Sequence, residues 1–169
     1  MAKYSPIILD IESSGFGSHS YPIEIGVIFE DKSKYCSLIK PESNWVHWSE
    51  EAEQLHHIKR DSLTIHGKSA YDVAKRLNKL LHGKIVYSDG WVVDSTWLIR
   101  LFEAAKIEMT FSLSAIEMIL KEQQMNLWDE MKKKVISELK LSRHRASNDA
   151  QIIQETFTRT LCVNQSPSH

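Results

Sequence analysis

The spacing of apolar residues along the chain predicts an opening block of three strands. Apolar, largely β-branched runs cover residues 5–12, 22–30 and 34–39, and Pro41 then ends the third run. Between residues 69 and 81 the apolar positions change to helical spacing, and Gly83 follows where a helix would end. Two further short strands are expected, at residues 84–88 and 109–111.

The remaining periodic segments predict helices. Ser49 precedes three glutamates within four residues and is expected to cap a helix, and a short helix is expected near residues 59–65. Asp94 is expected to open a helix that carries Trp97 and Leu98. Three more helices are expected, from Ser112 or Ser114 to about residue 123, over residues 126–139 and over residues 148–161. Three initial strands joined to strand–helix–strand units predict an α/β fold with a mixed sheet of about five strands and helices on both faces.

Composition narrows the class of protein without naming a function. The chain has 169 residues, 42% of them hydrophobic and 25% charged, which is typical of a globular protein of one domain. One domain over residues 1–163 is expected, with a flexible tail over residues 164–169. The start of the chain does not look like a signal peptide and no apolar run would cross a bilayer, so a cytoplasmic location without membrane contact is expected.

Charge argues against one kind of nucleic-acid binding. The net charge is -1, whereas proteins that coat long duplexes neutralise many phosphates with lysine and arginine. A nuclease is not excluded by this value, because metal ligands add negative charge that a bound cation reverses.

Two carboxylates in an apolar run are the first candidate for chemistry. Asp10 and Glu12 are separated by one residue, so in a strand both leave the same face. Like charges placed so close together repel each other, and a hard divalent cation with oxygen ligands would relieve that repulsion. The alternative is the polar face of an exposed edge strand.

Asp94 is the second candidate ligand. It follows a short apolar segment and precedes a strongly amphipathic one, so packing of the helix would fix its position. The alternative is that Asp94 only caps the helix. Asp89 is a rival for the same role, although it lies in an Asp-Gly turn, where aspartate is common for backbone reasons.

A third cluster lies near the end of the chain. His144 precedes the last predicted helix and Asp149 falls in its first turn, which makes the two side chains neighbours. Histidine is the usual general base near neutral pH. The alternative is a surface histidine in a basic loop and another first-turn acid.

Taken in order, these segments resemble the DEDDh 3'-to-5' exonucleases, a family that includes the proofreading subunit of bacterial replicative polymerases, ribonuclease T and oligoribonuclease. The five residues that match the family motifs span most of the chain: Asp10, Glu12, Asp94, His144 and Asp149. Two departures stand out. Ser13-Ser14-Gly15 replaces the usual pair of threonines and glycine, and residues 89–94 differ from the usual second motif. The resemblance implies a ribonuclease H-like fold.

The resemblance also implies a mechanism. Two divalent cations, Mg²⁺ or Mn²⁺, would be held by the four carboxylates, with Asp10 as the bridging ligand, and His144 would take a proton from the attacking water. The expected reaction releases 5'-mononucleotides from the 3' end of single-stranded DNA or RNA. The sequence does not favour either sugar.

Contacts with substrate are expected from four residues. Phe16 could stack on a terminal base, Ser13 and the backbone near Ser14 could bind the terminal sugar, and His57 belongs to a segment similar to the family's loop at the terminal nucleotide. Two other functions remain open, a catalytically weak module that binds nucleic acid or a polymerase, and a ribonuclease H-type endonuclease. A homodimer or a polymerase partner is also possible.

Overall fold

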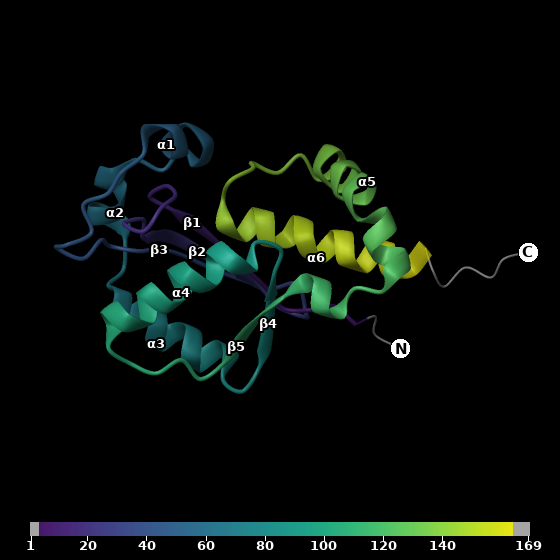
Figure 1. Ribbon diagram of the computed structural model, residues 1–169, viewed down its shortest axis with the longest axis horizontal. Helices are drawn as coiled ribbons and strands as arrows, with labels where there is room; N and C mark the ends of the chain where they lie inside the picture. Colours follow the sequence, from purple (N-terminus) through teal and green to yellow (C-terminus); the bar gives the residue numbers. More distant parts are fainter. Residues whose placement is uncertain (1–3, 164–169) are drawn as a thin grey trace, which may run out of the picture.

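The computed structural model describes residues 4–163 and contains a five-stranded mixed sheet (Figure 1). The strands lie in the order β3-β2-β1-β4-β5. Antiparallel pairing joins the first three, and β4 and β5 run parallel to β1. Their bounds are β1 Ile8–Ser13, β2 Pro22–Ile28, β3 Lys34–Leu38, β4 Ile85–Ser88 and β5 Ser112–Ala115. The tail expected over residues 164–169 lies outside the described residues.

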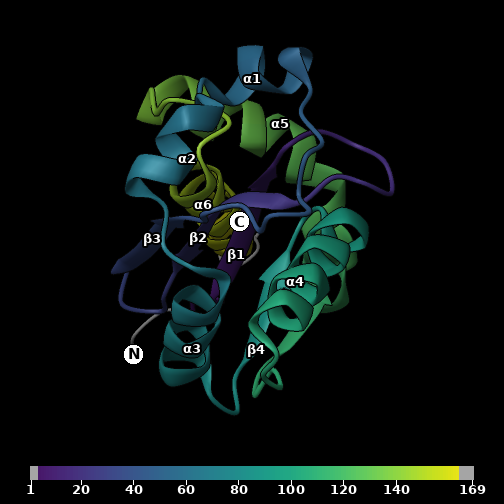
Figure 2. The ribbon, with the colours of Figure 1, turned by 90° about the vertical axis from the view of Figure 1, so that its left-hand side faces the viewer.

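Helices cover both faces of this sheet, as the sequence predicted (Figures 1 and 2). On one face α6 packs against β1 and β2, and α5 packs against α6. On the other face α3 and α4 pack together over the larger part of the core, while α1 and α2 lie beyond one end of the sheet. The helices are α1 Glu50–His56, α2 Arg60–His66, α3 Ala70–Leu81, α4 Trp91–Ala105, α5 Glu122–Leu139 and α6 Ala146–Val163.

The alternation of β1 divides its side chains between these two layers. Leu9 and Ile11 belong to the large core under α3 and α4, whereas Ile8 belongs to the smaller core under α6. Asp10 and Glu12 therefore continue the face of Ile8 and point to the side of the sheet where α6 begins.

Three predicted elements differ from the structure. The last strand is β5, at Ser112–Ala115, and residues 109–111 are not a strand. The helix expected from Ser112 or Ser114 to residue 123 is absent from the described chain, where a 3₁₀ helix (η1, Ile116–Ile119) follows β5 and α5 begins at Glu122. The helix α4 begins at Trp91, so Asp94 lies within its first turn and does not open it.

Within residues 4–163, no helix combines the length and the apolar character that crossing a membrane requires.

Candidate active site

The two carboxylates of β1 lie on the sheet face that meets the start of α6. In the antiparallel pair with β2, Asp10 lies opposite Gly26 and Glu12 lies opposite Glu24. Gly26 carries no side chain at the point where the backbone of Ser147 passes over the strand, and a Cβ there would overlap that backbone. This close approach brings the first turn of α6 over Asp10 and Glu12.

Asp94 reaches the same place from α4. Its side chain is buried, with 3% of the residue exposed, and the hydroxyl of Ser88 at the end of β4 donates a hydrogen bond to its Oδ2. The rival, Asp89, forms an ion pair with Lys132 of α5 over 2.7 Å. Of the two, only Asp94 lines the cleft that holds Glu12 and His144.

His144 and Asp149 come from the turn before α6 and from its first turn. The backbone of His144 is left-handed, with φ of 58°, and its N–H donates to the Asp149 carboxylate over 3.1 Å. Arg143 also donates to this carboxylate, over 2.9 Å. One ligand atom from each of Glu12, His144 and Asp149 lies within 4.8 Å of the other two, which is close enough for a shared cation.

All five motif residues meet in one cleft of about 250 Å³. Strand β1 supplies one wall, α4 a second and the start of α6 a third, with α1 at the rim. The cleft is lined by Asp10, Ile11, Glu12, Ser13, Gly15, Phe16, Ala52, Leu55, His56, Gly90, Val93, Asp94, Trp97, His144 and Asp149.

Burial and mutual repulsion favour the protonated forms of Asp10, Glu12 and Asp94. Burial, reinforced by Asp149, Glu24 and Asp94, raises the pKa of Glu12 to about 8. Burial also raises the pKa of Asp94 to about 7, although the hydrogen bond from Ser88 opposes the rise. The pKa of Asp10 lies well above its usual range because of burial and of the charges on Asp94 and Glu12. A site built in this way favours a cation over free carboxylates.

The donor set fits a hard divalent cation. The Oδ2 atom of Asp10 is out of contact with solvent and has no hydrogen-bond partner. Buried polar atoms are nearly always paired, so an unpaired carboxylate oxygen beside three other carboxylates is well suited to bind a metal ion. Asp10, Glu12, Asp94 and Asp149 would be the ligands.

Of the four residues predicted to contact substrate, two line the cleft and two do not. Ser13 and Phe16 line the cleft, and Phe16 is 76% exposed. Ser14 is fully buried beneath the loop, where its hydroxyl bonds to Nδ1 of His47 and accepts from the backbone of Tyr21. His57 ends α1 in a left-handed conformation and lies outside the cleft.

The neighbouring histidine, His56, lines the cleft and was missed in the sequence. It is buried, with 3% exposed, and its Nδ1 accepts a hydrogen bond from the backbone N–H of Ile58. In a neutral ring the proton must then be on Nε2, and that atom is buried without a partner. Burial lowers the pKa of His56, which favours this neutral form. His56 is the last residue of α1 and His57 follows it in a left-handed conformation. The sequence does not reveal where α1 ends, so it does not show which of the two histidines faces the cleft.

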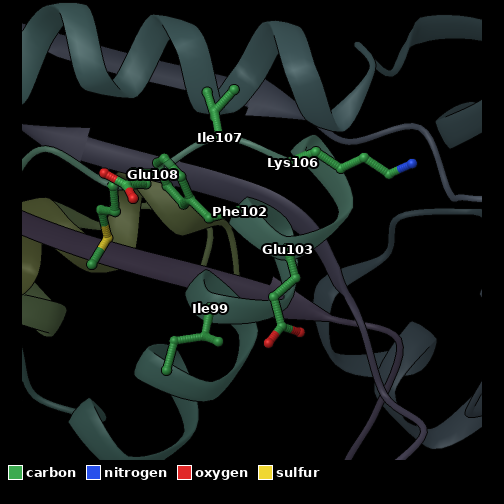
Figure 3. Close-up of a pocket in the computed structure, with 7 residues that line it drawn as sticks. Ile99, Phe102, Glu103, Lys106, Ile107 and Glu108 are labelled. Atoms are coloured by element: carbon green, nitrogen blue, oxygen red, sulfur yellow. The ribbon is translucent and has the colours of Figure 1, made fainter.

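A second hollow, of about 380 Å³, lies between the end of α4 and the segment that follows it (Figure 3). Phe102 and Ile107 are apolar parts of its wall, while Glu103 and Glu108 extend in different directions. Since its lining contains no histidine and its two carboxylates do not converge, this hollow does not offer a set of ligands for one cation. The candidate chemistry lies in the cleft between β1, α4 and α6.

Comparison with known proteins gives matches in structure alone. Neither a family profile nor a curated protein sequence matches the chain. Exonuclease I of E. coli in complex with a dA16 oligonucleotide matches with a TM-score of 0.66 over 93% of this chain and 41% of that chain, at 12% identity. A zinc-bound complex of E. coli exonuclease I with single-stranded DNA has a TM-score of 0.65, at 13% identity, over 96% of this chain and 41% of that one.

A moderately thermophilic exonuclease I from Methylocaldum szegediense matches with a TM-score of 0.64 at 12% identity, over 98% of this chain and 41% of its own. The chain thus spans about two fifths of the length of these exonucleases. The similarity covers nearly all of the chain and confirms the fold that its resemblance to the DEDDh exonucleases implied. The chain has the ribonuclease H-like fold of exonuclease I.

Proposed function

We propose that this protein is a metal-dependent 3'-to-5' exonuclease that releases 5'-mononucleotides from single-stranded DNA or RNA. One observation carries the proposal: Asp10, Glu12, Asp94, His144 and Asp149, taken from three separate segments of the chain, line a single cleft. A protein that only bound nucleic acid would not require four buried or half-buried, mutually repelling carboxyl groups at one point. The fold shared with exonuclease I supports the assignment to nucleic-acid hydrolysis.

The residues of the cleft divide into three roles. Asp10, Glu12, Asp94 and Asp149 would hold two divalent cations, Mg²⁺ or Mn²⁺, which supply an acidified water and stabilise charge on the leaving 3' oxygen. His144 lies beside Glu12 and Asp149, where it can accept the proton of the attacking water. Phe16 is the exposed aromatic side chain available to stack on a terminal base.

The Nε2–H of His56 is a hydrogen-bond donor that suits the terminal nucleotide of a nucleic-acid strand. Its buried Nε2–H has no partner in the protein, so a substrate oxygen at the cleft wall would satisfy it. We assign His56, in place of His57, to contact with the terminal nucleotide. The solved exonuclease I complexes with dA16 and with a 5cy-dT13 oligonucleotide support a single strand as the occupant.

The direct test is digestion of matched single-stranded DNA and RNA, each labelled at the 5' end, with Mg²⁺ or Mn²⁺ and with a 3'-blocked control. A ladder that shortens from the 3' end, stops at the block and disappears with EDTA is expected. Internal cuts would instead indicate a ribonuclease H-type endonuclease, and retention of the strand without cleavage would indicate a binding module.

Substitution of His144 separates proton transfer from metal binding. His144→Gln should lower kcat by roughly 100-fold to 10,000-fold, because it removes the general base while the four carboxylates stay in place. Mn²⁺ affinity, measured by calorimetry, should change little. A His144→Gln protein that hydrolyses the labelled strand at the normal rate would show that another group takes the proton.

A further inference from the structure

An ion pair between a buried carboxylate and a half-exposed arginine lies directly behind the turn that carries His144. Glu24 of β2 has a side chain that is 1% exposed, and Arg145 binds it from two nitrogens, Nε at 3.1 Å and Nη2 at 2.6 Å. The backbone N–H of Ala146 donates to the same carboxylate over 2.8 Å. Glu24 does not line the cleft. Its charge is buried to hold the turn, since a buried carboxylate is tolerated only when its bonds are complete.

The turn itself needs such support. His144 is in the left-handed region with φ of 58°, a conformation that is unfavourable for residues other than glycine. Arg143 and Arg145 flank it, and each is tied to a carboxylate, Arg143 to Asp149 and Arg145 to Glu24. A strained backbone persists when the surrounding structure fixes it from more than one side.

The two attachments differ in what they would do in a working enzyme. Asp149 would bind a cation, so its bond to Arg143 competes with metal binding. Glu24 lies one strand away, directly opposite Glu12 in the β1–β2 register, and has no such competitor. The pair formed by Glu24 and Arg145 therefore ties the His144 turn to the sheet at a fixed place beside Glu12.

We propose that Glu24 is a positioning residue for the proposed exonuclease reaction, and that it acts on His144 through Arg145. This inference rests on the proposed function. It assigns Glu24 neither metal nor substrate. Its role is to set the direction from which the imidazole meets the attacking water, a geometry in which a displacement of about 1 Å can reduce the rate 100-fold.

Kinetics of three variants test the proposal. Glu24→Gln and Arg145→Gln should each lower kcat by roughly 10-fold to 100-fold at saturating Mn²⁺, with KM within about twofold of the wild type. In a His144→Gln background, Glu24→Gln should cause no further loss, because two residues that act through one group are not additive. Full additivity in the double variant would overturn the proposal.

A matched control separates positioning from general stability. Glu30→Gln removes the acid of an exposed pair with Lys84, at 3.4 Å, and should leave kcat unchanged. If Glu24 only stabilised the fold, Glu24→Gln would lower the melting temperature while kcat per folded molecule stayed normal, which would refute the proposal. Should Glu24→Gln fail to fold, Arg145→Gln, at a half-exposed side chain, gives the same test.

A measurement without substrate separates this proposal from the proposed function. The His144 imidazole resonances, assigned by their loss in His144→Gln, should shift in Glu24→Gln and in Arg145→Gln but not in Glu30→Gln. Resonances that stay in place would overturn the positioning role even if the wild type is an active exonuclease. If the His144 resonances shift in both variants but the wild type digests no strand, the link from Glu24 to His144 is supported and the proposed activity is refuted.

Discussion

At the residue scale, the candidate site combines groups that are unfavourable together unless a cation binds. Four carboxyl groups face one cleft, and burial and repulsion raise the pKa values of Asp10, Glu12 and Asp94. The folded chain therefore keeps protons on groups that the unfolded chain would release. Function and stability oppose each other at these positions.

The raised pKa values predict how stability depends on pH when EDTA removes metal. The Glu12 pKa rises from 4.5 to about 8 on folding and that of Asp94 from 3.8 to about 7, so the folded state binds more protons than the unfolded state between these values. Stability is highest below about pH 4 for these groups and should be lost as the pH rises through about 8. Urea denaturation in EDTA at pH 5 and pH 8 measures this, with Glu12→Gln as the control that flattens the dependence. Higher stability at pH 8 would contradict the prediction.

The ion pair between Arg143 and Asp149 predicts competition with metal binding. Arg143 donates to Asp149 over 2.9 Å, and both are partly exposed. Arg143→Gln removes a positive charge beside a proposed metal ligand and should tighten Mn²⁺ binding by roughly 3-fold to 10-fold, equivalent to about 1 kcal/mol for a partly exposed pair. Calorimetric titration with Mn²⁺ checks this, with Lys84→Gln as a distant control. Weaker binding in Arg143→Gln would show that the arginine supports the carboxylate's metal-binding position.

Whether the sequence alone reveals a site residue depends on the interaction that fixes the position of its side chain. Asp10 and Glu12 share a face because a strand alternates, so spacing alone placed them together. His56 could not be chosen over His57, because the difference is whether Nδ1 accepts a hydrogen bond from Ile58 at the end of α1. Glu24 was also passed over, since its partner Arg145 is 121 residues away in the sequence.

At the scale of elements, the contact between β2 and α6 controls the site. Gly26 lies under the first turn of α6, and a Cβ there would overlap the backbone of Ser147. The helix must move to make room, and His144 and Asp149 would move with it.

The Gly26→Ala substitution should therefore lower both the activity and the stability of the protein. Overpacking at a backbone contact costs about 1–3 kcal/mol, and kcat should fall at least 10-fold because Asp149 leaves its place beside Glu12. Chemical denaturation and the labelled-strand assay measure the two effects. Cys36→Ala is a suitable control, since Cys36 lies opposite Gly26 on β3 and the change adds no atoms. A Gly26→Ala protein with normal activity would show that α6 can shift without disturbing the site.

The elements that were misplaced from the sequence begin at positions that no local sequence pattern marks. β5 is a four-residue edge strand rich in serine, and its position is fixed by pairing with β4, which no local pattern reveals. The helix α4 begins after Gly90, which forms no side-chain cap, so a search for a capping residue selects Asp94 instead. The amphipathic helix α3 was predicted within one residue of its observed bounds, because its apolar spacing marks the face that packs on the core. The starts of α5 and α6 were predicted four and two residues too late.

At the scale of the whole molecule, metal binding should raise the free energy of unfolding and with it the melting temperature. A ligand that binds only the folded state stabilises it by about 2.7 kcal/mol at 100 times its dissociation constant. Mn²⁺ at that level should raise the melting temperature of the wild type by several degrees over that in EDTA. Asp10→Asn should abolish this rise and all hydrolysis, yet be more stable than the wild type in EDTA at pH 8, because it removes a buried carboxyl group whose raised pKa costs free energy on folding at that pH. An equal rise in Asp10→Asn would exclude Asp10 as a ligand.

The position of α6 has a consequence for how the protein is made. Asp10 and Glu12 leave the ribosome before His144, which lies in the turn that leads into α6, and before Asp149, which lies in the first turn of that helix; α6 packs against β1 and β2. Domains take their final form once the segments that complete their core have been synthesised. A nascent chain would therefore hold an incomplete set of ligands until α6 docks. The order of synthesis would thus delay the proposed nuclease activity until α6 has packed against the sheet.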